Sequence, residues 1–173
     1  PTATTTYMVT GTDANGCVNT ATTTLTVNAL PTVTANTSSA SVCTGGSVTL
    51  TGGGAATYVW DNNVTDAISF VPTATTTYMV TGTDANGCVN TAMTTVTVNP
   101  LPVITATSSA AVVCAGASVT LTGGGAATYT WDNNVTDTVS FVPTATTTYM
   151  VTGTDSNGCV NTAMTTVAVN ANP

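Results

Sequence analysis

The sequence lacks every positively charged side chain: none of its 173 residues is Lys, Arg or His, and its seven charged residues are all Asp. A net charge of −7 without any cation excludes the basic surface that nucleic-acid binding requires. The absence of His, Lys, Arg and Glu also removes the usual general bases, Schiff-base amines and oxyanion-binding groups. We therefore expect no enzymatic activity, no cofactor and no nucleic-acid partner.

Long apolar runs are also missing. No stretch approaches the roughly 18 apolar residues of a membrane-spanning helix, so we expect no membrane insertion. No positively charged segment opens the chain, and we expect any secretion signal to lie outside this stretch. Threonine is the abundant residue, with 46 of the 173 positions. Because Thr and Val are β-branched and fit a pleated surface, the composition favours strands.

The chain is built from a 71-residue repeat. Tyr7, Tyr78 and Tyr149 follow one another at this step, and so do Trp60 and Trp131. The segments 1–71 and 72–142 are identical at 57 positions, without insertion or deletion. Near-identical tandem copies of domain size are typical of arrays in which each copy is one compact module.

Proline-containing segments mark the boundaries between modules. Proline removes a backbone donor and stiffens a connection, so Leu30-Pro31 and Asn99-Pro100-Leu101-Pro102 indicate linkers. We expect folded modules at residues 31–100 and 101–173, with residues 1–30 as the C-terminal part of a preceding module. This first segment encodes two strands, and since a lone hairpin is marginal in water, we expect it to be ordered only in an assembly.

Within a module, short runs of alternating apolar and polar residues are separated by turn residues. The expected strands cover residues 47–51, 58–60, 68–70, 78–81 and 89–98, and a tight turn is expected at 84–87. The expected inward-facing pairs are Val48 and Leu50, Tyr58 and Trp60, Ile68 and Phe70, and Val96 and Val98. About seven short strands per module, with no helical periodicity, predict an all-β antiparallel sandwich.

Three motifs together resemble the bacterial immunoglobulin-like repeats of giant secreted surface proteins and adhesins of Bacteroidota-type bacteria. They are Cys-x-Gly-x-Ser-Val-Thr-Leu-Thr-Gly, then Tyr-x-Trp, then Pro-Thr-Ala-Thr-Thr-Thr-Tyr-Met-Val-Thr-Gly-Thr-Asp-x-Asn-Gly-Cys. The resemblance covers the whole chain. It implies tandem immunoglobulin-like modules, a location outside the cell or on its surface, and no catalysis.

Two cysteines per small module in a secreted protein are typical of disulfides. We expect pairs within the modules, Cys43 with Cys88 and Cys114 with Cys159, while Cys17 has its partner upstream of this stretch.

The usual immunoglobulin arrangement places the two cysteines of one module at opposite poles, beyond the ~4.4–6.8 Å between Cα atoms that a disulfide needs. Cys43 would then reach Cys159 of the next module, which is the alternative pairing. If residues 61–66 form only a turn, one chain reversal disappears and the within-module pairs become possible.

Oxygen-bearing side chains gather in one loop of each module. Asp, Asn and Asp recur there in the same pattern, as Asp61, Asn63, Asp66 and as Asp132, Asn134, Asp137. Such oxygens are calcium ligands, but Asp and Asn also bind their own backbone in turns, and the turn interpretation is preferred.

Glycan attachment is a further hypothesis. Asn36, Asn63 and Asn134 each begin an Asn-x-Thr/Ser sequon. Thr138, between Asp137 and Val139, is similar to the O-glycosylation motif of Bacteroidota.

These observations predict a structural extracellular repeat protein that forms a stalk, fibre or filament on or outside a bacterial cell. The alternative is an adhesin module that binds a glycan or another surface ligand, for instance through outward threonines such as Thr95 and Thr97. Because neutral strand faces offer little repulsion, we also expect the modules to associate with further copies of the same repeat.

Overall fold

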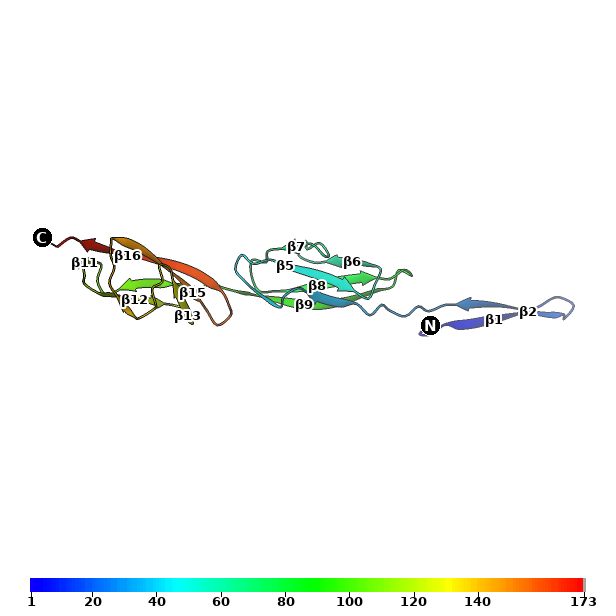
Figure 1. Ribbon diagram of the computed structural model, residues 1–173. Coiled ribbons are helices and arrows are strands. Elements are labelled where there is room, and N and C mark those ends of the chain that lie inside the picture. Colours follow the sequence, from blue (N-terminus) through cyan, green and yellow to red (C-terminus); the bar gives the residue numbers. More distant parts are fainter. Residues whose placement is uncertain (173) are drawn as a thin grey trace. The chain divides into compact units, whose positions relative to one another are not determined.

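The chain is all-β, as predicted. Sixteen strands run through residues 1–172, the part that this computed structural model describes, and no helix there could span a membrane (Figure 1). The described chain divides into two compact units. One consists of Pro1–Ser38, Val48–Phe70 and Thr77–Thr95, and the other of Ser39–Ser47, Val71–Thr76 and the residues from Val96 onward.

The first two strands form a hairpin of their own. Strand β1 (Thr5–Thr12) pairs with β2 (Val18–Leu25) in an antiparallel two-stranded sheet. The turn between them is held by Asp13, whose Oδ1 accepts hydrogen bonds from the backbone N–H groups of Asn15 and Cys17. Gly16 adopts the left-handed conformation, with φ of 79°, which glycine tolerates best.

The next seven strands form two sheets. They are β3 (Thr34–Thr37), β4 (Ser41–Cys43), β5 (Val48–Gly53), β6 (Thr57–Trp60), β7 (Ser69–Phe70), β8 (Thr76–Thr83) and β9 (Val89–Asn99). One sheet has the order β3-β5-β7 and the other the order β4-β9-β8-β6. All of these strands lie inside the predicted module of residues 31–100, although the boundaries themselves stay a prediction.

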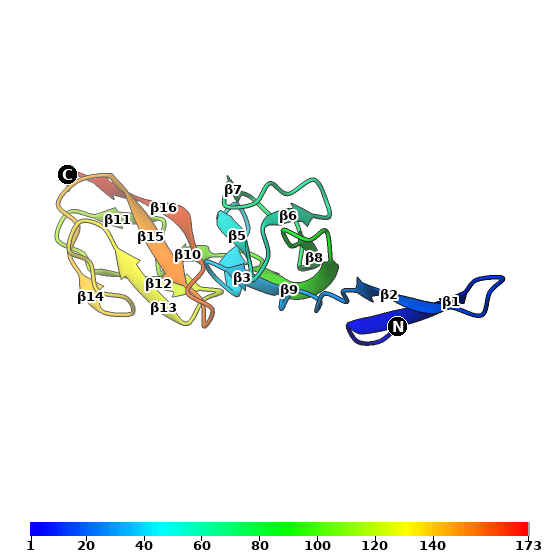
Figure 2. The ribbon, with the colours of Figure 1, turned by 90° about the vertical axis from the view of Figure 1, so that its right-hand side faces the viewer.

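The last seven strands repeat this arrangement one period further along the chain (Figure 2). They are β10 (Thr105–Ser108), β11 (Val112–Cys114), β12 (Val119–Gly124), β13 (Thr128–Trp131), β14 (Ser140–Phe141), β15 (Thr147–Thr154) and β16 (Val160–Asn170). Their sheets have the orders β10-β12-β14 and β11-β16-β15-β13. The sequence period is therefore also a structural period.

In each repeat the strands thus form two sheets, and the chain alternates between them as in a β-sandwich. Apolar residues from both sheets are buried in each sandwich. In the second, the core contains Val119 and Leu121 of one sheet and Trp131, Tyr149 and Val151 of the other. The predicted inward positions Val48, Leu50, Trp60 and Val96 are buried at the equivalent places of the first.

One inward assignment is wrong. Ile68 is 59% exposed, whereas its expected companion Phe70 is partly buried and contacts Tyr78 edge to face. The reason is local. Ala67 has φ of 59°, and the N–H of Ile68 closes a turn by donating to the carbonyl of Thr65, so strand β7 begins only after Ile68.

Two further strands are present that the sequence pattern did not predict. Thr34–Thr37 pairs with β5, and Ser41–Cys43 forms the short strand β4, which runs parallel to β9. Both are too short to show a clear alternation. Strand β4 has the greater consequence, because it determines where Cys43 lies.

Candidate functional site

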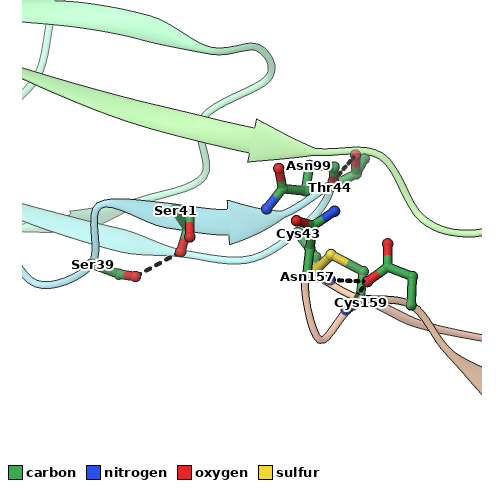
Figure 3. Close-up of a disulfide and its surroundings, with 8 residues drawn as sticks. Ser39, Ser41, Cys43, Thr44, Asn99, Asn157 and Cys159 are labelled. Carbon is green, nitrogen blue, oxygen red and sulfur yellow. Dashed lines mark hydrogen bonds between the residues drawn. A yellow bond between two sulfur atoms is a disulfide. The ribbon is translucent and has the colours of Figure 1, made fainter. Parts of the chain in front are cut away.

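The site that distinguishes this chain is a disulfide between Cys43 and Cys159, 116 residues apart (Figure 3). The two Cα atoms are 5.6 Å apart, within the range that an unstrained disulfide adopts. Both residues belong to the second compact unit. Cys159 is completely buried, and Cys43 is partly buried at the end of β4.

The expected within-module pairs, Cys43 with Cys88 and Cys114 with Cys159, are therefore not formed. Strand β4 runs parallel to β9, with Cys43 opposite Asn99 at the end of that strand. Cys88 lies just before Val89, where β9 begins. The eleven residues of β9 thus separate the two cysteines by roughly 36 Å at ~3.3 Å per residue.

The second sandwich has the same geometry, with Cys114 opposite Asn170 at the end of β16 and Cys159 before its start. Residues 61–66 do form a turn, as the within-module hypothesis required, but the parallel strand β4 still keeps the two cysteines at opposite ends. The alternative pairing from the sequence, Cys43 with Cys159, is the one present.

Hydrogen bonds fix the backbone on both sides of the disulfide. The Oδ1 atom of Asp155 accepts from the N–H groups of Asn157 and Cys159, both at 2.8 Å. On the other side, the N–H of Thr44 donates to the carbonyl of Asn99 at 2.8 Å. Figure 3 shows Cys43 and Cys159 between these two anchored segments. The bond therefore joins a strand end to a hydrogen-bonded hairpin turn.

The remaining three cysteines carry free thiols: Cys17 and Cys114 are exposed, and Cys88 is partly buried. The 71-residue period relates each of them to one of the two bonded cysteines. Cys114 is equivalent to Cys43, while Cys17 and Cys88 are equivalent to Cys159. The repeat therefore contains two kinds of cysteine, and the observed bond joins one of each kind from consecutive repeats.

The predicted calcium loop is organised around its carboxylates. The Oδ1 atom of Asp66 accepts from the indole Nε1–H of Trp60 at 2.8 Å and from the N–H of Gly52 at 2.7 Å. Asp137 makes the same two bonds with Trp131 and Gly123. Asp66 thus satisfies the polar group of a buried indole.

The second aspartate of the loop binds the neighbouring strand. Asp61 Oδ1 accepts from the N–H of Met79 at 3.1 Å, and Asp132 binds Met150 in the same way. Asn63 and Asn134 are exposed and have φ of 58°, the left-handed conformation that Asn tolerates. The two aspartates therefore bind partners outside their loop, not the loop's own backbone as the turn interpretation expected, while the left-handed Asn residues are typical of a turn.

Within residues 1–172, no group of three or more His, Cys, Asp or Glu side chains could hold a metal ion. Calcium binding at the Asp and Asn oxygens of these loops stays a prediction from the residue types.

The glycosylation candidates Asn36, Asn63, Asn134 and Thr138 all lie at exposed positions. The side-chain amide of Asn36 already donates to Thr34 Oγ1 and to the carbonyl of Thr51, each at 3.3 Å. The hydroxyl of Thr138 donates to the carbonyl of Asp137 at 2.7 Å. Glycosylation at any of these residues stays a prediction.

Replacing Asp66 by Ala should destabilise the first sandwich by about 2–4 kcal/mol, because two hydrogen bonds to a carboxylate are lost and the buried indole N–H is left unpaired. Urea denaturation measures this change. Thr65→Ala, an exposed neighbour in the same loop, is the matched control and should change stability by less than about 0.5 kcal/mol. Equal effects of the two substitutions would contradict the structural role of Asp66.

No protein-family model matches the sequence, and no curated protein matches it. Among solved structures, one similar chain is a Ca²⁺-stabilized adhesin that helps an Antarctic bacterium reach out and bind ice, with 21% identity and a TM-score of 0.47. The match covers 98% of this chain and 57% of that one, so this chain spans little more than half its length.

A second similar structure gives insight into host cell surface retention of a 1.5-MDa bacterial ice-binding adhesin. The matched chain has 19% identity and a TM-score of 0.39, and the match covers 99% of this chain and 76% of that one. A third is the Protocadherin GammaB4 extracellular domain, with 10% identity, a TM-score of 0.27, and coverage of 97% and 43%. All three TM-scores are below 0.5, so the fold assignment rests on the strand order described above.

Proposed function

We propose that this chain is a structural segment of an extracellular repeat protein, a stalk, fibre or filament on or outside a bacterial cell, in which disulfides reinforce consecutive repeats. The observation that carries this proposal is the Cys43–Cys159 bond. Its separation of 116 residues exceeds the 71-residue period. The bond therefore reinforces a series of repeats, whereas a bond within one module would stabilise that module alone.

The chemistry of the chain supports the same proposal. A stable disulfide fits an oxidising environment outside the cytoplasm. Each 71-residue copy brings the same strands and turns, and the carboxylates of Asp61, Asp66 and Asp84 all bind backbone or indole N–H groups. The repeated residues thus maintain the fold, and added copies contribute length.

A ligand-binding adhesin module would need an exposed cluster of aromatic or charged side chains. Trp60 and Trp131, the only tryptophans, are buried and hydrogen-bonded to aspartates. No specific contact therefore favours the adhesin function over the structural one.

Lateral association of the modules is part of the proposal. The edge strands of the first sandwich are β3, β7, β4 and β6, and the sequence offers no lysine to protect them. Lysine on edge strands normally discourages pairing with another sheet. The edges of this protein lack that protection, which favours contact with further copies.

Imaging of the native material tests the proposed function. Strand β9 alone spans roughly 36 Å at ~3.3 Å per residue, so modules in series should give fibres with an axial period of about that length or slightly more. Antibodies against residues 31–100 should decorate such fibres outside the cell. Decoration confined to dispersed, non-fibrous material would contradict the proposal.

The disulfide can be tested separately on the purified chain. In the chain-entropy model, closing a loop of this length stabilises the folded state by roughly 5 kcal/mol, so reduction should lower the melting temperature. A Cys43→Ser variant should melt like the reduced protein, while Cys88→Ser should melt like the oxidised one. An unchanged melting temperature on reduction, together with titratable thiols at Cys43 and Cys159 in the native protein, would contradict the assignment.

A further inference from the structure

The β1–β2 hairpin presents an apolar face that no other part of residues 1–172 covers. Strands β1, β8 and β15 have the identical sequence TTYMVTGT. Tyr7 is nevertheless 49% exposed, whereas Tyr78 and Tyr149 are 5% and 4% exposed. Val9 is 65% exposed, and the equivalent Val80 is fully buried. The same residues thus have opposite environments in one chain.

The difference does not come from the hairpin itself. In β1–β2, Thr5 lies opposite Leu25 and Val9 opposite Ala21. The β15–β16 pair, two repeats further along the chain, has the same register, and there Thr147 lies opposite Val167. The turns are also alike, with Asp13 and Asp155 each accepting two backbone hydrogen bonds. The hairpin therefore already has the register and the turn of the equivalent hairpin in a complete sandwich.

In the complete sandwich, the preceding strands cover this face. Strand β6 pairs with β8, so that Trp60 lies opposite Val80. Phe70 of β7 packs edge to face on Tyr78, with ring centroids 5.4 Å apart. Trp60 and Phe70 both belong to the segment 31–71, which comes just before the hairpin strands in the repeat.

The surroundings of three equivalent glycines show the same difference between covered and uncovered hairpins. A Cβ atom added at Gly82 would overlap the side chains of Val33 and Ala55, and one added at Gly153 would overlap Ile104. At the equivalent Gly11, nothing lies within 4 Å. The space over Gly11 is therefore open, whereas side chains of the preceding segment fill the equivalent space over Gly82 and Gly153.

We propose that the apolar face of β1–β2 binds the strands of a further copy of residues 31–71, carried ahead of Pro1 on the same polypeptide. Only five residues connect β7 to β8, so a segment joined in this way is held at high effective concentration next to the hairpin. A separate intact copy of the chain cannot supply this segment. Its residues 31–71 are already paired with its own β8–β9 hairpin, and the equivalent residues 102–142 are paired with its β15–β16 hairpin.

The contact is apolar and carries no ion pair, since the chain contains no cationic side chain. The residues that would be buried on the hairpin are Tyr7, Val9 and Leu25, and their equivalents Tyr78, Val80 and Val96 are all buried. Added salt should therefore leave this binding intact, because screening weakens only charged contacts.

The experiment compares amide hydrogen exchange in the 173-residue chain and in a chain extended by residues 31–71 ahead of Pro1. Strand β2 is the reporter, because Thr22 and Leu25 give its peptides masses different from those of β9, which has Met93 and Val96 at these positions. We expect exchange in Val18–Leu25 to slow by about 100-fold or more in the extended chain.

Gly11→Val is the matched variant. In the 173-residue chain it meets open space and should leave exchange in β2 and the melting of both sandwiches unchanged. In the extended chain, the added valine side chain would overlap the residues equivalent to Val33 and Ala55 in the added segment. The protection of β2 should therefore be lost. The melting transition of the unaltered sandwiches verifies that this variant is otherwise folded.

Two results would overturn the proposal. One is equal exchange of Val18–Leu25 in the extended and the 173-residue chain. The other is protection in the 173-residue chain that rises with protein concentration, because a second copy would then cover the face. Protection that requires the added segment and is abolished by Gly11→Val supports the proposal.

Discussion

Pulled from its two ends, the oxidised chain should extend by roughly 400 Å less than the reduced chain, since each extended residue contributes ~3.4 Å. The Cys43–Cys159 bond carries the force directly and shields the 116 residues that it closes. Single-molecule force spectroscopy measures the difference as contour length, without and with a reducing agent. The sandwich strands from β5 to β15 lie inside the shielded segment.

Two variants provide the controls. Cys43→Ser should release the full contour length without any reducing agent, because the bond cannot form. Cys88→Ser removes a thiol that is free in the structure and should leave the extension of the oxidised chain unchanged. If the oxidised and reduced chains reach the same contour length, Cys43 and Cys159 are not bonded in solution.

Replacing Gly54 by Ala should destabilise the first sandwich by about 4 kcal/mol, through a left-handed backbone and an unrelieved steric overlap. Gly54 has φ of 81°, and an added Cβ would overlap the carbonyl oxygen of Thr32. That oxygen belongs to the backbone, so the overlap cannot be relieved by a change of rotamer. Urea denaturation gives the change in unfolding free energy.

Gly87→Ala isolates the steric contribution. Gly87 has the same φ of 81°, but nothing lies within 4 Å of the position that its Cβ would take. The substitution should therefore cost only the left-handed backbone term, about 1–2 kcal/mol. Similar losses for Gly54→Ala and Gly87→Ala would show that the approach of Thr32 is not tight in solution.

Much of the fold was predictable because the repeat presents each pattern twice. The alternation around Leu50 and Trp60 led to correct inward positions, and the turn ending in Gly87 has the conformation expected from its residue types. Ile68 shows the limit of alternation at a strand of two residues. A turn immediately before β7 directs this side chain to solvent despite its apolar character.

The pairing of the cysteines depends on the short strand β4, which a sequence pattern does not reveal. Strand β4 has only three residues and pairs in parallel with the end of β9. The residues Ser41-Val42-Cys43 contain no pattern that predicts β9 as their partner. The hydrogen bond from the indole of Trp60 to Asp66 was also not predicted. Its signal, a tryptophan followed six positions later by an aspartate in both repeats, was present but looked like ordinary turn chemistry.

The long reach of the disulfide also bears on damage to the backbone. Cleavage of any peptide bond between Cys43 and Cys159 leaves two fragments that stay covalently joined through the sulfur atoms. Because 116 residues exceed the period of 71, the same bond repeated along an array would give loops that overlap. Every peptide bond in the interior of such an array would then lie within at least one loop, and a single proteolytic nick would not sever it.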